Sequence, residues 1–374
     1  MSQAAVSQTI LSKLRLLEMR KKRKNLISIF FELTARCNNN CRHCCINLPS
    51  QDRQARKQEL SFSEIKQIAD EAVSLGTLLC LITGGEPLLR EDFFDIYLYL
   101  KKKGFLIGVF TNATLITKEH VKFFKKYPPF NLEVTVYGSD RQTYECISKK
   151  PGSFAAFMRG LNLLLKNGIP VRLKTMALRS NIQKLPQIED FCRARTKDTF
   201  RIDSFLNLRY DGNQTRNNEI RSERLSAEEI VAMEESSPKR LQALKKYGPK
   251  LIDPKASEIK CNHVFNCATG CSTITIGYDG FFRLCISLVH PDCIYDLRKG
   301  TFTDAWNNFI TRVRNMRSNN EYFLNKCHRC QLFNLCAWCP GNAYLENKEL
   351  DKPVEYFCKI AYARAGLVTK INTE

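Results

Sequence analysis

The spacing of the cysteines is the feature that most restricts how this chain can fold. Cys37, Cys41 and Cys44 form a C-x3-C-x2-C array within the segment FELTARCNNNCRHCCIN. Iron–sulfur clusters are normally held by four cysteines, so three thiolates so close together suggest a cubane with one iron left open. Metal centres that do chemistry keep such an open position. For the array alone, a zinc site or three buried structural cysteines remain alternatives.

Two further motifs follow apolar runs downstream of this array. Gly84-Gly85-Glu86-Pro87 follows one run, and Thr111-Asn112 follows another. Together with the cysteine array, the Gly84–Pro87 motif resembles the radical S-adenosylmethionine (SAM) enzymes, and the C-terminal cysteines resemble the SPASM subgroup of that superfamily. The resemblance spans residues 27–374, which is nearly the whole chain.

Apolar runs rich in Val, Ile and Phe alternate with amphipathic segments of helix length from Leu26 to residue 208, which is typical of βα units. The predicted strands are residues 27–34, 78–83, 105–111, 131–137, 170–178 and 199–207. Ser61 and Glu64 predict a capping box at the first helix between them. Chemistry in such folds collects at the C-terminal ends of the strands. The cysteine array, the Gly84–Pro87 motif, Asn112 and Thr135 all fall at or next to such ends, which indicates one active site.

We therefore predict an α/β fold, a partial (β/α)6 TIM-like barrel followed by a cysteine-rich SPASM domain. The predicted segments are a basic N-terminal helical extension (1–26), the radical SAM barrel (27–210), a charged helical connector (211–258) and the auxiliary-cluster domain (259–374).

Composition restricts the setting of the protein. An apolar content of 44% in 374 residues supports a substantial core. Seventeen cysteines without a signal peptide indicate metal binding in a reducing compartment, so we expect a cytoplasmic protein. No apolar run approaches the length of a membrane span, about 20 residues.

The formal net charge of +20 raises the question of nucleic acid. The excess is spread over the N-terminal segment and the first two thirds of the chain, and bound thiolate clusters would reduce it. The charge indicates an acidic partner, either an acidic peptide segment or an acidic redox protein. A basic solvated surface without a partner is the alternative. The resemblance implies a flavodoxin- or ferredoxin-type electron donor. A non-catalytic iron–sulfur or zinc protein that binds nucleic acid is the alternative from another class, although such a module has no need of the Gly84–Pro87 motif.

The C-terminal cysteines include paired C-x2-C units, which by spacing alone also suit zinc. The SPASM resemblance implies two auxiliary [4Fe–4S] clusters instead. Carried over position by position, one cluster is held by Cys261, Cys267, Cys285 and Cys339, and the other by Cys327, Cys330, Cys336 and Cys358. Only two residues separate Cys336 from Cys339, where the subgroup has three, so the allocation of these two is open, and Cys271 can replace Cys267. The remaining cysteines, Cys45, Cys80, Cys146, Cys192 and Cys293, are expected mostly to pack as small apolar residues.

The superfamily resemblance also implies roles for residues of the barrel. Cys37, Cys41 and Cys44 hold a [4Fe–4S] cluster whose open iron binds SAM, and SAM is reductively cleaved to a 5′-deoxyadenosyl radical that abstracts a substrate hydrogen. Gly84 and Gly85 permit close approach of the backbone. Glu86 accepts from the methionine ammonium of SAM. The other expected cofactor contacts are Asn112, Thr135 and Lys174, and the expected catalytic residues are Asp203, Arg209 and Asp211.

The SPASM resemblance favours a peptide or protein as substrate, modified by cross-linking or oxidation. A small molecule such as a tetrapyrrole or an aminoglycoside is the alternative.

Overall fold

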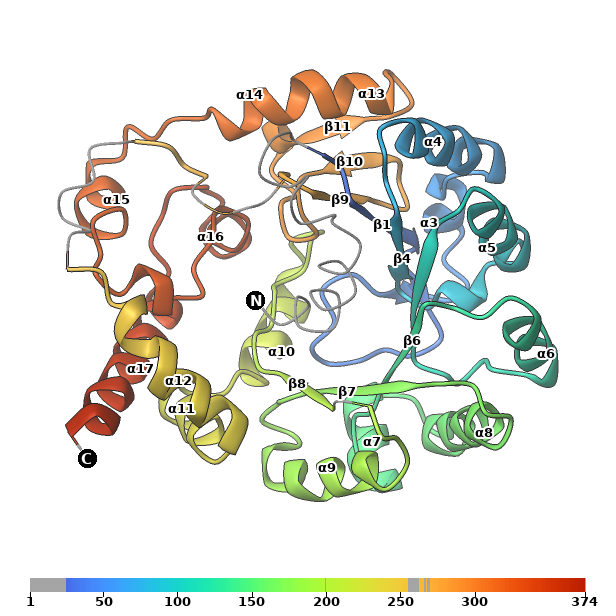
Figure 1. The fold of residues 1–374 in the computed structure, drawn as a ribbon, viewed down its shortest axis with the longest axis horizontal. Coiled ribbons are helices and arrows are strands. Elements are labelled where there is room, and N and C mark those ends of the chain that lie inside the picture. The colour runs from blue at the N-terminus through green and yellow to red at the C-terminus, as the bar shows by residue number, and fades with distance from the viewer. Residues whose placement is uncertain (1–24, 199, 255–261, 266, 268–269, 374) are drawn as a thin grey trace.

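The computed structural model describes residues 25–373 apart from 199, 255–261, 266 and 268–269 (Figure 1). The predicted N-terminal helix and Cys261 therefore lie outside the described residues. Among the described residues, no helix is long and apolar enough to cross a membrane.

One nine-stranded sheet organises the fold, with the strand order β11-β10-β9-β1-β4-β5-β6-β7-β8. Six of its strands are parallel neighbours from the first part of the chain: β1 (Ser28–Thr34), β4 (Leu79–Gly84), β5 (Leu106–Thr111), β6 (Asn131–Thr135), β7 (Arg172–Met176) and β8 (Arg201–Asp203). Each of the six predicted strands matches one of these, which confirms the partial barrel. The last is shorter than predicted because β8 pairs only with β7, over three residues.

Helices separate these strands and cover the outer face of the sheet, as Figure 1 shows for the first four of them. They are α4 (Phe62–Ser74), α5 (Phe93–Lys102), α6 (Lys118–Lys126), α8 (Ser153–Lys166) and α9 (Leu185–Arg193), with the shorter α3 (Arg53–Gln58) and α7 (Arg141–Ser148). The predicted capping box is present at α4, where Ser61 caps the helix and Glu64 bonds back to the Ser61 backbone. Alternate strand residues such as Ile29, Phe31 and Leu33 are buried in the main core.

Three strands from the C-terminal part extend the same sheet. They are β9 (Thr273–Ile276), β10 (Phe281–Arg283) and β11 (Ile294–Asp296), and β9 pairs in parallel with β1. The sheet therefore continues past the predicted boundary at residue 259. The division into four segments stays a proposal about organisation.

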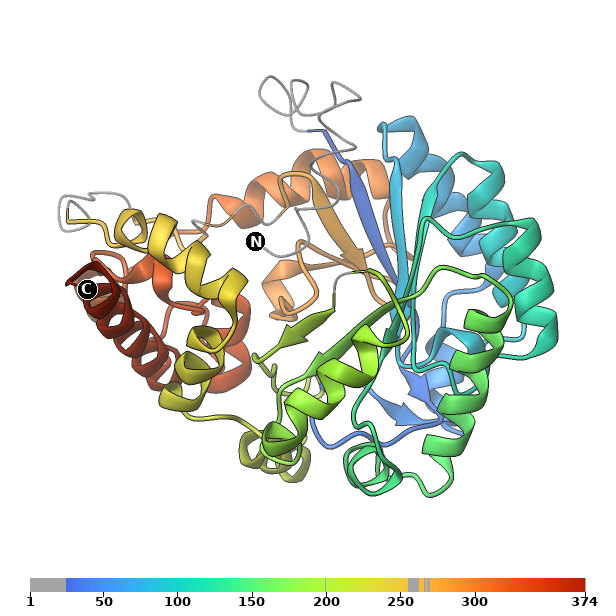
Figure 2. The same ribbon diagram turned by 60° about the horizontal axis from the view of Figure 1, so that its bottom comes forward.

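The rest of the chain is mainly helical. The connector contains α10 (Gln214–Ser222), α11 (Ala227–Glu235) and α12 (Pro238–Leu251), and the C-terminal part contains α13 (Phe302–Asp304), α14 (Ile310–Arg314), α15 (Glu321–Lys326), α16 (Pro340–Asn347) and α17 (Glu355–Thr373). Helix α17 packs against α11 and α12, and Figure 2 shows these three helices gathered to one side of the barrel.

Candidate metal and cofactor site

The cysteine array lies on a loop that leaves the C-terminal end of β1. A small parallel pair, β2 (Arg36–Cys37) and β3 (Leu48–Pro49), closes the loop. Its middle is fixed to the end of α7, because the backbone N–H groups of Asn40 and Arg42 donate to the carbonyls of Ser148 and Ile147 at 2.9 and 3.0 Å. The loop is thus tied to the barrel at both ends and at its centre.

The three thiols of the array are close enough to interact electrostatically. Burial, followed by the charges of Cys41, Glu86 and Cys44, raises the pKa of Cys37. Burial and the charge of Cys44 raise the pKa of Cys41 to about 12. Such mutual repulsion is relieved when thiolates bind a cationic metal centre.

The arrangement of the ligands bears on the kind of metal centre. Over the described part of the chain, no group of three Cys, His, Asp or Glu side chains is placed to hold one metal ion. The indication of a [4Fe–4S] cluster comes from the spacing of Cys37, Cys41 and Cys44 in the sequence.

The Gly84–Pro87 motif forms a turn directly behind this loop. Gly84 has φ of +122°, and a Cβ at Gly84 or Gly85 would come within 2.3 Å of Thr34 O or 2.2 Å of Arg36 O. Only glycine fits at these two positions. The turn therefore packs closely against the start of the cysteine loop. The approach of its backbone to the cofactor stays a prediction.

Glu86 is fully buried, and both of its carboxylate oxygens already accept hydrogen bonds. Oε1 accepts from Thr111 Oγ1 at 2.8 Å and Oε2 from the Asn112 N–H at 2.8 Å, while Leu88 N donates to Oε1 at 3.2 Å. Burial raises the pKa of Glu86 to about 7, and these hydrogen bonds oppose that rise. The carboxylate thus joins the ends of β4 and β5. Its contact with the methionine ammonium stays a prediction.

Asn112 connects that junction to the metal-binding loop. Its side-chain amide donates to Asn38 Oδ1 at 2.9 Å and to Cys37 Sγ at 3.8 Å. Asn112 therefore lies beside the first predicted ligand, and its contact with the cofactor stays a prediction.

Thr135, Lys174 and Asp203 lie on three adjacent strands, where Thr135 pairs with Lys174 and Met176 with Asp203. Lys174 already has partners: its Nζ lies 2.8 Å from Glu133 Oε1 and 3.5 Å from the centre of the Phe110 ring. Burial lowers the pKa of Lys174. Asp203 pairs with Arg201 at 3.0 Å. The structure brings these residues together across β6–β8, and their roles stay predictions.

Arg209 and Asp211 pair with each other, with Arg209 Nη2 2.5 Å from Asp211 Oδ2. Arg209 is 4% exposed and its Nη1 donates to both the carbonyl and the side-chain oxygen of Asn47 at 3.0 Å. These contacts place the pair against the end of the cysteine loop. Arg209 also interacts electrostatically with Cys44 of the array. The catalytic role of the pair stays a prediction, and these hydrogen bonds fit a positioning role.

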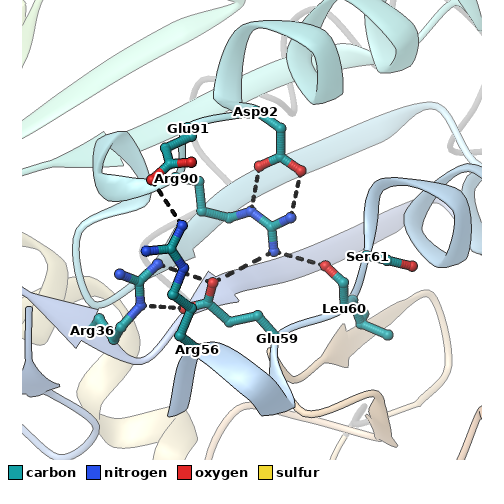
Figure 3. A pocket seen from close by; sticks show the side chains of 8 residues that line it. All are labelled: Arg36, Arg56, Glu59, Leu60, Ser61, Arg90, Glu91 and Asp92. Carbon is teal, nitrogen blue, oxygen red and sulfur yellow. Dashed lines mark hydrogen bonds and ion pairs between the residues drawn. The ribbon is translucent and has the colours of Figure 1, made fainter. Parts of the chain in front are cut away.

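A cavity of about 340 Å³ lies behind the loop and the Gly84–Pro87 turn (Figure 3). It is lined by Arg36, Arg56, Glu59, Leu60, Ser61, Arg90, Glu91 and Asp92. Each arginine has an acidic partner: Arg36 bonds Glu59 at 2.7 Å, Arg90 bonds Asp92 at 2.6 Å and Arg56 bonds Glu91 at 2.8 Å. Because these three ion pairs neutralise the arginines, the cavity has no excess positive charge to bind an anion. The network instead supports Arg36, which directly precedes Cys37.

Sequence reasoning missed this network and also missed Arg216 of α10, whose Nη2 donates to Cys41 O at 2.7 Å. Arginines in charged helices are normally surface residues, so the sequence carries no signal that separates Arg216 from its neighbours.

The C-terminal cysteines fall into two electrostatically coupled groups. Burial and the charges of Cys285 and Cys267 shift the pKa of Cys339, which is raised to about 12. Burial, followed by Cys358, Cys336 and Cys330, raises the pKa of Cys327 to about 12. Cys336 is thus grouped with the second predicted ligand set and Cys339 with the first. The allocation of ligands to two clusters stays a prediction, and Cys261 lies outside the described residues.

Comparisons with known proteins agree with this site. Residues 31–192 match the family model described as the radical SAM superfamily. Over 336 residues the chain is 26% identical to an AdoMet-dependent heme synthase of Methanosarcina barkeri, covering 84% of this chain and 91% of that protein. Over 156 residues it is 30% identical to the antilisterial bacteriocin subtilosin biosynthesis protein AlbA of Bacillus subtilis, covering 41% of this chain and 34% of that protein.

Among solved structures, the chain resembles Streptococcus suis SuiB bound to the precursor peptide SuiA. The TM-score is 0.66 at 16% identity, over 92% of this chain and 78% of the other. The shared fold therefore includes the C-terminal part as well as the barrel.

The three-cysteine loop and the Gly84–Pro87 turn both fall within the residues that match the radical SAM family model. The chain contains a radical SAM domain over residues 31–192, and the cofactors of that superfamily are a [4Fe–4S] cluster and SAM.

Proposed function

We propose that this radical SAM enzyme modifies a peptide or protein segment by cross-linking or oxidation, with two auxiliary clusters in its C-terminal part. The observation that supports it most is the meeting of the cysteine loop, the Gly84–Pro87 turn and Asn112 at the C-terminal ends of β1, β4 and β5. Active sites of barrel enzymes collect at this end of the strands.

Cys37, Cys41 and Cys44 would hold the radical SAM cluster, and Gly84 and Gly85 would let the backbone approach the methionine part of SAM. When bound and reduced, the cluster with SAM supplies a 5′-deoxyadenosyl radical that abstracts a substrate hydrogen. The residues of this chain bind and orient the cofactor and substrate.

The two C-terminal groups would each bind a [4Fe–4S] cluster. The proposed ligands of the second cluster are Cys327, Cys330, Cys336 and Cys358. All four lie within the described residues, and their thiols interact electrostatically with one another. Four protein thiolates leave no iron open, which favours electron transfer over substrate binding at that cluster. A flavodoxin- or ferredoxin-type donor, acidic like the expected substrate segment, would suit the net charge of +20.

A peptide substrate is supported by the likeness to SuiB with its precursor peptide and by the partial match to AlbA. A tetrapyrrole substrate is the second candidate, because the match to the AdoMet-dependent heme synthase spans almost the full length of both chains. An acidic peptide and a carboxylate-bearing tetrapyrrole are both anionic, so the net charge does not separate them.

Turnover of both substrate classes by one reconstituted preparation tests the proposal. The protein would be incubated anaerobically with SAM, a reductant and either short peptides encoded beside its gene or an iron porphyrin that bears propionates. Loss of two hydrogens from a peptide by mass spectrometry supports the proposal. Turnover of the porphyrin alone would overturn the peptide substrate and leave the radical SAM assignment in place, whereas no SAM cleavage by protein with a full iron content would overturn both.

A further inference from the structure

Residues 209–216, which run from the end of the barrel segment into the connector, bond the cysteine loop at three backbone carbonyls. The donors and acceptors are Tyr210 N with Cys45 O at 3.1 Å, Arg209 Nη1 with Asn47 O at 3.0 Å, and Arg216 Nη2 with Cys41 O at 2.7 Å. The carbonyls belong to a predicted ligand and to residues within three positions of Cys44. The loop is therefore held both by this segment and by the end of α7, and Lys149 just after α7 pairs with Glu219 of α10 at 2.8 Å.

Arg216 is held firmly for this contact. Asn213 caps α10 by accepting from the Arg216 N–H at 3.0 Å, which places Arg216 in the first turn of the helix. Its Nη1 bonds Glu219 at 2.5 Å while Nη2 reaches the loop, and the side chain is 17% exposed. Because Nη1 is held by Glu219, Nη2 has a fixed direction and can orient the Cys41 carbonyl that it bonds.

Arg209 has the same kind of support. Its backbone N–H donates to Asn217 Oδ1 at 2.8 Å, and its Nε bonds Asp211 at 2.9 Å. Asn47 lies between the two arginines, since its side-chain oxygen accepts from Arg209 Nη1 at 3.0 Å and from Arg216 Nη2 at 3.4 Å. Both arginines therefore act on the same part of the loop.

The positive charge of Arg216 lies next to the array, because its Nη2 donates to the carbonyl of Cys41 at 2.7 Å. A cluster gains negative charge when it is reduced, so a nearby cation favours reduction. Glu219 and Asp211 neutralise the arginines overall, but removal of one arginine would leave its acidic partner beside the loop.

We infer that Arg209 and Arg216 are positioning residues for the metal-binding loop, fixing its carbonyls and making the cluster held by Cys37, Cys41 and Cys44 easier to reduce. This inference rests on the proposed function. It assigns to residues 209–216 a role in the radical chemistry of the barrel, although none of them is a predicted ligand.

The experiment compares reconstituted full-length variants. Arg216→Gln removes the positive charge and the guanidinium that bonds Glu219 and Cys41 O together. Arg216→Lys keeps the charge, but an ammonium cannot bond both partners in the planar geometry of the guanidinium. Arg221→Gln is the matched control, because Arg221 lies on the same helix, is 39% exposed and contacts Glu346 at 3.4 Å, away from the loop. Electron paramagnetic resonance of the reduced protein, with and without SAM, reports the radical SAM cluster separately from the auxiliary clusters.

For Arg216→Gln we expect a more negative midpoint potential of the radical SAM cluster. We also expect the SAM-responsive signal to be lost 10–100-fold faster in the presence of a chelator, because replacing a residue that supports metal ligands typically weakens metal binding by about this factor. Arg216→Lys should keep the wild-type potential but lose the signal faster than wild type, and Arg221→Gln should match wild type in both.

An unchanged potential and lifetime in Arg216→Gln would overturn the inference. If that variant does not fold by circular dichroism, an unchanged signal lifetime in Arg216→Lys would overturn it instead. A wild-type protein that forms no SAM-responsive cluster would overturn the proposed function itself, which is a distinguishable failure.

Discussion

The barrel and the C-terminal part both contain proposed cluster ligands, but they hold them in different ways. The barrel ligands lie on one short loop fixed to α7 and to Tyr210 by backbone hydrogen bonds, and closed by the β2–β3 pair. The proposed C-terminal ligands among the described residues are spread from Cys267 to Cys358; Cys327 follows α15, Cys339 directly precedes α16, and Cys358 lies in the first turn of α17. We therefore expect the barrel to shape its site before metal binds, and the C-terminal part to depend more on its clusters for structure, as small metal-binding domains do.

The largest effect is expected from removing the barrel ligands. Replacing Cys37, Cys41 and Cys44 with Ala should abolish 5′-deoxyadenosine formation, because no open iron remains to bind SAM. Iron content should fall from about twelve to about eight atoms per chain by the cluster count, while the fold stays intact. Iron analysis, product detection and circular dichroism check this, and 5′-deoxyadenosine formed at the wild-type rate would contradict the assignment of the array.

Next in size is the effect of stripping all iron with a chelator, which tests the comparison directly. We expect amide hydrogen exchange to increase strongly in residues 320–358 and little in β1, β4 and β5, because only the C-terminal segments need metal to stay ordered. Mass spectrometry of exchanged peptides gives the readout. Equal loss of protection in both regions would show that the barrel site is not preformed.

A smaller effect is expected from Gly85→Ala. The added Cβ would meet Arg36 O at 2.2 Å and Ala35 O at 2.6 Å, both backbone atoms that can yield only if the loop shifts. Overpacking of this kind costs about 1–3 kcal/mol, and SAM binding should weaken with it. Gly366→Ala in α17 is the control, since nothing lies within 4 Å of its added Cβ. Thermal unfolding and SAM titration measure both, and equal effects of the two substitutions would disprove the close-approach argument.

The smallest effect concerns the pH dependence of the barrel junction. Burial raises the pKa of Glu86 to about 7 from 4.5, so the folded state holds this proton more tightly than the unfolded chain. The associated stability is present below pH 4.5 and is lost as the pH rises through 7, by at most about 3 kcal/mol. In Glu86→Gln this dependence disappears.

Unfolding of wild type and Glu86→Gln by denaturant, in the absence of iron and across this pH range, provides the measurement. A constant difference between the two proteins from pH 4.5 to 7 would mean that Glu86 is ionised throughout. Its predicted cofactor contact would then be the more plausible reason for its presence.

Local sequence signals were sufficient for much of the architecture. The six barrel strands follow from alternating apolar runs, and the start of α4 follows from Ser61 and Glu64, because hydrophobic periodicity and capping depend on residues close in the chain. The cysteine spacing likewise indicated the metal site, since all three ligands lie on one loop.

Only the tertiary structure decided how distant segments meet. That β9 extends the sheet beside β1, that Glu86 is buried against Thr111 and Asn112, and that Lys174 is already paired with Glu133 all depend on contacts between residues far apart in sequence. The same holds for Arg216, which bonds Cys41 across 175 positions of the chain. A charged residue leaves no periodic pattern that names its partner, so its role follows from where the fold places it and not from its neighbours in sequence.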